Sequence, residues 1–180
     1  MPVSSSDVQR RLTTKDGTAG NSQPGTPNGS LGKYVATTLL TDNTLHNLFD
    51  LVTGAENQAQ ESEYRCLAFL NNHATSSMTN LKAWIVSQGS GGVNFEIGAD
   101  TNGAAPKDQT SAQFLEVANE DTAPAGVAFS APTTEGAAIT LGGGTVPAGS
   151  VVGLWIRRIA TDSPAKSGDD VLIRIKWDSV

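Results

Sequence analysis

Cysteine, histidine and long apolar runs are scarce in this chain of 180 residues, which has one cysteine and two histidines. Because Cys66 is the single thiol, no disulfide can form within the chain, and folding without one is typical of a reducing compartment. No segment approaches the roughly 18 consecutive apolar residues that span a bilayer. The first residues also lack the apolar stretch of a signal peptide. We therefore expect neither secretion by a signal peptide nor insertion into a membrane.

Long helical patterns and internal repeats are missing as well. Glycine occurs 19 times and proline 8 times, together with many serines, threonines and asparagines, which indicates short elements joined by turns. Such a composition favours an all-β domain over a fold with alternating strands and helices. A chain of this length forms one domain of ordinary size and buries enough surface for a core without disulfides.

Apolar and polar residues alternate with a period of two over much of the chain, which predicts strands that bury one face. The segments with this pattern or with short β-branched runs are residues 34–40, 63–70, 81–88, 93–97, 127–129, 137–141, 151–160 and 171–177. We expect 63–70, 81–88 and 93–97 to form a meander, and the last two strands to form a hairpin through residues 161–170. The pattern predicts an antiparallel β-sandwich, immunoglobulin-like or jelly-roll-like. The residues expected in its core are Val152, Leu154, Ile156, Val171, Ile173 and Ile175.

At most one or two short helices are expected. Leu45, Leu48, Phe49 and Val52 have the spacing of one helical face, and Gly54 follows as a stop signal. The alternative is that this stretch continues an irregular segment at the edge of a sheet.

Residues 1–33 have almost no large apolar side chains and are rich in glycine, proline, asparagine and serine. Four basic against two acidic residues give this part a charge of +2, whereas residues 34–135 have three basic and twelve acidic residues, or −9. We interpret residues 1–33 as an extended N-terminal arm that orders against a neighbour. Residues 34–180 are then the β-sandwich domain.

Residues suited to catalysis or metal binding occur without the spacing that such chemistry needs. His46 and His73 accompany no nucleophile motif, and Cys66 lies within a strand as a small apolar residue does. One cysteine and two distant histidines exclude a zinc site. The loop from Asp100 to Asp108 offers oxygen ligands but lacks the closing glutamate of an EF-hand, and calcium binding there is left open. We therefore predict no enzyme, no catalytic residue, no cofactor and no metal site.

The basic residues are too few for nucleic-acid binding by a chain with a net charge of −6. Ion pairs between subunits suit them better. The residues proposed for such contacts are Arg10, Arg11, Lys15, Arg157 and Arg158. The three tryptophans, Trp84, Trp155 and Trp177, are the residues that a carbohydrate-binding module would use to stack on sugars, and they are more typical of a core or interface.

Six short segments are similar to a family of small structural proteins of tailed bacteriophages. They are Asn28-Gly-Ser-Leu-Gly32, Asn47-Leu-Phe-Asp50, Glu63-Tyr-Arg-Cys66, Asn71-Asn-His-Ala74, Asn119-Glu-Asp-Thr-Ala-Pro124 and Leu154-Trp-Ile-Arg-Arg158. The resemblance covers most of the chain, and no segment in it has a chemical mechanism attached.

The resemblance implies a virion component that decorates and cements the capsid shell by bridging neighbouring capsid subunits. Its partners would be the major capsid protein and further copies of this chain, expected as a closed trimer. It would be made and assembled in the host cytoplasm. The alternatives are a tail, neck or fibre component of the virion, or a carbohydrate-binding β-sandwich module.

Overall fold

The structure is a computed structural model that describes residues 1–89, 91–164 and 169–179. Its strands are β1 (Val8–Thr14), β2 (Tyr34–Leu39), β3 (Ser62–Asn71), β4 (Met78–Gln88), β5 (Val93–Ala99), β6 (Ala105–Pro106), β7 (Ile139–Thr140), β8 (Thr145–Val146), β9 (Ser150–Ala160) and β10 (Val171–Ser179). The helical elements are the single α-helix α1 (Gly54–Ala59) and the 3-10 turns η1 (Ser5–Asp7), η2 (Glu135–Ala137) and η3 (Gly142–Gly144). No helix within these described ranges is long and apolar enough to cross a membrane.

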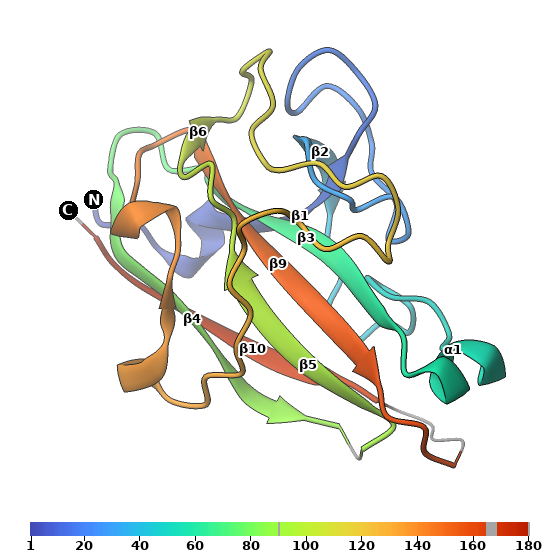
Figure 1. The fold of residues 1–180 in the computed structure, drawn as a ribbon. Helices are drawn as coiled ribbons and strands as arrows, with labels where there is room; N and C mark the ends of the chain where they lie inside the picture. Colours follow the sequence, from blue (N-terminus) through green and yellow to red (C-terminus); the bar gives the residue numbers. More distant parts are fainter. Residues whose placement is uncertain (90, 165–168, 180) are drawn as a thin grey trace.

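The strands form two antiparallel sheets, which confirms the predicted all-β sandwich. The larger sheet has the order β2-β1-β3-β9-β5, and β6 also pairs with β9. The smaller sheet has the order β10-β4-β7, and β8 also pairs with β4. Figure 1 shows β9 between β3 and β5, with the segment coloured yellow to orange crossing in front of it.

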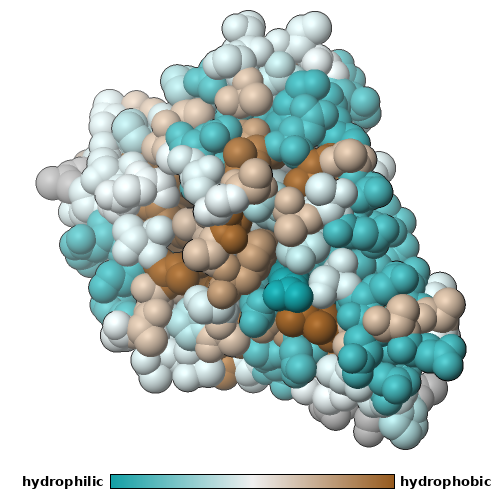
Figure 2. Space-filling view, viewed as in Figure 1, coloured by the Kyte–Doolittle hydropathy of each residue, from teal (hydrophilic) through white to brown (hydrophobic). Residues whose placement is uncertain are grey.

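The central strands of the larger sheet, β3 and β9, are buried on both faces. One face packs against the smaller sheet through a cluster that includes Leu67, Leu154 and Ile156. The other face is covered by long connections, and its cluster includes Phe114 and Trp155. Figure 2 shows apolar surface gathered near the middle of this loop-covered side and bordered by hydrophilic residues. The long loops therefore act as a third layer, which the strand pattern alone does not predict.

The structure places the first 33 residues within the sandwich, which corrects their interpretation as an arm separate from the body. Strand β1 lies between β2 and β3, and Leu12 at its centre is 2% exposed. Thr13 and Ser30 are fully buried because hydrogen bonds satisfy them: the Ser30 hydroxyl donates to the Cys66 carbonyl at 2.7 Å and accepts from the Thr13 amide at 2.9 Å. Small polar residues thus pack in this segment through hydrogen bonds, not through apolar bulk.

The helix expected over 45–52 is absent, and this stretch is irregular, as the alternative interpretation held. Asn43 and His46 have left-handed backbone angles, with φ of 54° and 56°, which interrupt a helix there. The α-helix begins further on, after Thr53. The Thr53 hydroxyl accepts from the Glu56 amide at 3.3 Å, and the Glu56 carboxylate accepts from the Thr53 amide at 2.6 Å. This capping box fixes the start of α1.

Two predicted strand pairings are wrong. Strands β3 and β5 lie in the larger sheet and β4 in the smaller one, so they form no meander. Strand β10 pairs with β4 and not with β9, so the last two strands form no hairpin. Residues 165–168, which are part of the loop expected between these two strands, lie outside the described residues. Residues 127–129 form no strand, although Ser130 makes a single bridge with Ile97. Alternation reveals which face a strand buries but carries no information on its neighbour.

The predicted core is confirmed for β9 and only partly for β10. Val152, Leu154 and Ile156 are at most 1% exposed. By contrast, Ile173 and Ile175 are half-buried, because β10 ends the smaller sheet and has a neighbour on one side only.

Candidate interaction site

Two arginines are buried at one end of the larger sheet. Arg65 on β3 is 0% exposed and Arg158 on β9 is 7% exposed. Antiparallel pairing places Arg158 directly opposite Glu63, two residues before Arg65 on the same strand. Burying a charge is costly unless it is paired and hydrogen-bonded, so the surroundings of these two guanidinium groups need to supply acids.

Three carboxylates supply them. The Nε of Arg158 donates to Oε2 of Glu63 at 2.6 Å, and Arg65 forms an ion pair with Glu120. The carboxylate of Asp50 lies 3.5 Å from Nη2 of Arg158 and 4.0 Å from Nη2 of Arg65. Burial raises the pKa of Glu63, and the neighbouring Arg158 opposes this rise. We call these five residues, Asp50, Glu63, Arg65, Glu120 and Arg158, the ion network.

The ion network holds the irregular segment 41–53 against the sandwich. Both guanidinium groups lie over the ring of Phe49, with Arg158 at 4.8 Å and Arg65 at 5.3 Å from its centroid. Nη1 of Arg158 also donates to the main-chain carbonyl of Asp50 at 2.5 Å. A segment without regular hydrogen bonding is thereby fixed by cation–π contacts and charged hydrogen bonds.

The three carboxylates of the ion network also have the spacing of metal ligands. One oxygen from each of Asp50, Glu63 and Glu120 lies within 4.8 Å of the others. Each of these acids is already paired with a buried guanidinium group, and two fixed positive charges at this distance oppose the binding of a cation. We therefore interpret the cluster as a structural ion network.

Five of the six short segments named from the sequence meet at this ion network. They contribute Asn28, Phe49 with Asp50, Glu63 with Arg65, Glu120, and Arg158. The sixth has a local role, since Asn71 is buried and its side-chain amide donates to the carbonyls of Ser76 and Val146. Segments far apart in the sequence thus share one place in the fold.

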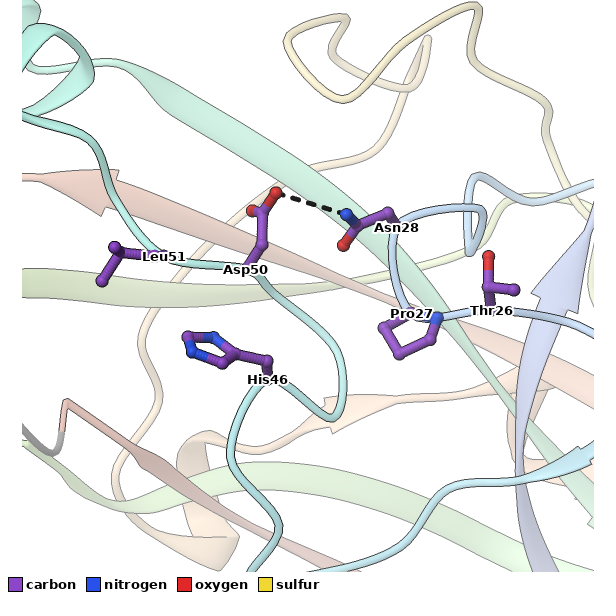
Figure 3. A pocket seen from close by; sticks show the side chains of 6 residues that line it. All are labelled: Thr26, Pro27, Asn28, His46, Asp50 and Leu51. Carbon is purple, nitrogen blue, oxygen red and sulfur yellow. Dashed lines mark hydrogen bonds between the residues drawn. The ribbon is translucent and has the colours of Figure 1, made fainter.

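A shallow hollow of about 580 Å³ lies beside the ion network and is lined by Thr26, Pro27, Asn28, His46, Asp50 and Leu51. Figure 3 shows Asn28 and Asp50 joined across it, where the Asn28 amide donates to Oδ2 of Asp50 at 3.3 Å. No hydrogen bond within the described chain joins His46 to Thr26 or Asp50, so the hollow assembles no nucleophile with a base.

The segment beside the hollow exposes two leucines. Leu45 is 79% exposed and Leu51 is 70% exposed, which is unusual for two leucines on one short segment. Leu51 lines the hollow itself. We call Leu45, Leu51 and this hollow the leucine surface.

The five basic residues predicted for contacts between subunits do not form one basic face. Arg10 pairs with Asp42, Arg11 bonds to Gln9 and Asn21, and Lys15 donates to the carbonyl of Ala118. Arg157 pairs with Glu96, while Arg158 belongs to the ion network. All five have partners within the chain, because strands β1 and β9 place them beside acids and carbonyls of other segments.

The remaining candidate residues have structural partners. Nδ1 of His73 accepts from the amides of Thr75 and Ser76 at 3.1 and 2.9 Å, which closes the turn after β3. Cys66 is 0% exposed, and burial raises the pKa of its thiol well above the usual value. A thiol in this state is a poor nucleophile.

The carboxylates of the loop from Asp100 to Asp108, where calcium binding was left open, point to separate partners. Oδ2 of Asp100 accepts from the indole of Trp155 at 2.8 Å and from the Leu115 amide at 2.9 Å, which pins the loop to the sheet. Asp108 accepts from Lys107 and Asn21, and the bond from Lys107 is the main reason that its pKa is lowered.

The tryptophans do not present the exposed platforms that a carbohydrate-binding module needs. Trp84 is 7% exposed, Trp155 is fully buried, and Trp177 is half-buried beside the N-terminal residues.

Sequence reasoning missed the acids of the ion network and Arg65. A signal for Glu63 and Arg65 is present, because Glu63 borders and Arg65 interrupts a segment that is otherwise apolar from Tyr64 to Leu70, and charges in such a strand require partners. Comparison with models of protein families, with curated proteins and with solved structures finds no match for this chain.

Proposed function

We propose that the protein is a structural component of a phage virion that decorates the capsid and bridges neighbouring capsid subunits. The observation that carries this proposal is the leucine surface, where Leu45 and Leu51 stand exposed on a segment fixed by buried charges. A protein that had no partner would gain nothing from holding two leucines in water. The resemblance to small phage structural proteins supplies the identity of the partner.

The chemistry of the leucine surface defines what it binds. Its leucines and the hollow lined by Leu51 accept apolar side chains of a partner. We assign the major capsid protein as that partner and a closed trimer as the assembled state, since a closed ring of copies suits a symmetry axis of a shell.

Bridging stabilises a shell by mass action. A protein that binds only the assembled lattice, at a hundredfold excess over its dissociation constant, adds about 2.7 kcal/mol per site. Many such sites resist internal pressure without any single strong contact. The rigid attachment of segment 41–53 favours this role, because ordering a loose segment on binding would reduce the affinity.

The test compares purified particles with and without the protein and measures the temperature of genome release. The expected result is that the protein is present in stoichiometric amount and raises this temperature. The double variant with Leu45→Asp and Leu51→Asp should lower occupancy about tenfold, the loss expected when central apolar contacts are removed. Val86→Asp, at an exposed apolar residue on the smaller sheet, is the matched control and should leave occupancy unchanged.

Absence of the protein from particles would overturn the proposal. Full occupancy with an unchanged release temperature would overturn the cementing role.

A further inference from the structure

The two sheets of the sandwich differ in width on one side. In the larger sheet β1 and β2 lie beyond β3, whereas the smaller sheet ends at β10. Val8, Arg10 and Leu12 share the face of β1 that looks toward the smaller sheet, because side chains two apart lie on one face. Leu12 is buried, yet half of the Arg10 side chain is exposed. The smaller sheet therefore does not reach over this part of β1.

A groove of about 320 Å³ occupies the gap. One side consists of Ser5, Val8, Arg10 and Phe69, and the other consists of residues 172–175 with Trp177. Ile173 and Ile175 face the core, while Leu172 and Arg174 face away from it. A groove that touches four consecutive residues of a strand, from both of its faces, follows the edge of that strand.

This edge of β10 has no strand beside it in the described part of the chain. Its other edge pairs with β4 along the whole strand. Only its last residues are covered, where the Ser179 hydroxyl accepts from the Val3 amide at 2.5 Å and the Trp177 indole donates to the Val3 carbonyl at 3.4 Å. An uncovered edge offers backbone amides and carbonyls to an added strand.

The charges along the edge select the added strand. Arg10 and Arg174 both line the groove; Arg10 is paired with Asp42, whereas Arg174 takes part in no ion pair among the described residues. A second copy that used the same edge would bring Arg174 opposite Lys176 in an antiparallel pair centred on Ile175. Like charges opposite each other destabilise a strand pair, so this register of an edge-to-edge dimer is disfavoured.

We propose that the free edge of β10 binds an extended acidic segment of a neighbouring protein by adding it as a strand to the smaller sheet. Alternate apolar side chains of the segment enter the groove over Val8 and Phe69, and its carboxylates, which lie on the opposite face of the added strand, meet Arg174. That the neighbour is a capsid subunit rests on the proposed function, and this edge would give the bridge a contact separate from the leucine surface. Strand addition itself is a property of the isolated chain.

The experiment uses the full chain, labelled with ¹⁵N, and two synthetic peptides in an extended design. One peptide alternates valine with glutamate and the other alternates valine with lysine. The glutamate peptide should bind, shift the amide signals of β10 and slow their hydrogen exchange. The lysine peptide should bind at least about tenfold more weakly, since the rim of the groove is cationic.

Two charge-changing variants test whether peptide binding depends on the edge of β10 or on the overall charge of the protein. Arg174→Glu should weaken binding of the glutamate peptide about tenfold and strengthen that of the lysine peptide. Lys82→Glu makes the same change of charge on β4, outside the groove, and should alter either affinity less than about twofold. A glutamate peptide in which every backbone nitrogen is methylated, so that it cannot donate a backbone hydrogen bond from either edge, should lose binding.

Equal affinity for the two peptides, retained binding of the methylated peptide, or amide shifts located away from β10 would overturn the proposal. Self-association through β10 without peptide would also overturn it. These results leave the particle test of the leucine surface unaffected, and absence of the protein from particles leaves strand addition intact, so the two failures are distinguishable.

Discussion

Strands β9 and β10 are both long and rich in branched aliphatic residues, but they differ in pattern and in their place in the structure. Strand β9 has an apolar run from Val151 to Ile156 broken only by Gly153, whereas β10 alternates apolar with charged residues from Ile173 to Asp178. Strand β9 has neighbours on both edges and cover on both faces, and most of its residues are buried. Strand β10 has one neighbour and alternates between half-buried and exposed residues. Burial is therefore determined by the place of a strand in the sheet as much as by its composition.

The largest expected effect compares two isoleucines at core-facing positions. Ile156→Ala on β9 should lower the free energy of unfolding by about 4 kcal/mol, because it leaves a cavity in a packed interior. Ile173→Ala on β10 should lower it by only about 1 to 2 kcal/mol, because the site is half-buried and the gap opens to water. Urea unfolding of both variants measures the difference. Equal losses would break the comparison between the two strands.

The next effect concerns the loop layer that covers β9. Gly32 has a φ of 91°, and a Cβ there would lie 1.8 Å from the carbonyl oxygen of Leu115. Gly32→Ala should lower the free energy of unfolding by about 3 kcal/mol, through backbone strain and displacement of the loop. Gly54→Ala is the control, since nothing lies within 4 Å of its added Cβ. A stable Gly32→Ala protein would show that the loop layer is dispensable.

A smaller effect on stability is expected at the buried ion pair between Glu63 and Arg158 of β9. Glu63→Gln removes a buried partner of Arg158 and should cost about 2 kcal/mol at neutral pH. The raised pKa of Glu63 also predicts a pH dependence. A carboxyl whose pKa is higher in the folded state stabilises the fold most when protonated, so this contribution falls as pH rises from about 4.5 through the raised pKa. The stability of the wild type should therefore fall relative to Glu63→Gln over this window, and denaturation at several pH values measures it.

The smallest effect is expected at the exposed ion pair of β10. Lys176 donates to Glu135 at 2.5 Å, and both side chains are about half exposed. The bond from Glu135 raises the pKa of Lys176, so its contribution is present below pH 10.5 and is lost as pH rises through the raised value. Glu135→Gln should leave the thermal midpoint at neutral pH unchanged within error, because exposed pairs contribute little. A clear loss of stability would show that this exposed pair contributes as much as a buried ion pair.

The sequence was sufficient for the sandwich, for both long C-terminal strands and for the first strand of the body. It was insufficient for pairing, because the alternation around Ile173 shows which face of β10 is buried and carries no information on which strand lies beside it. The role of residues 1–33 was missed for a different reason. Thr13 and Ser30 read as polar loop residues, and only the carbonyl of Cys66, more than thirty residues away, explains their burial.

The ion network shows the same limit. Arg158 stands out in the sequence, but its partners Glu63 and Asp50 are about 100 residues away and meet it only through strand register and a folded-back segment. The open edge of β10 is harder still to predict. It results from where the other strands pair, and the sequence of β10 itself does not show this.

Cys66 allows the opening of the larger sheet to be measured by the rate of a chemical modification. As the single cysteine, buried at the centre of β3, it reacts with an alkylating reagent only in molecules whose sheet has opened. The rate of its modification therefore reports how often β3 separates from its neighbours, without any label that disturbs the fold. A comparison of this rate in free and particle-bound protein shows how much a partner bound at the surface suppresses opening of the sheet at the middle of the sandwich.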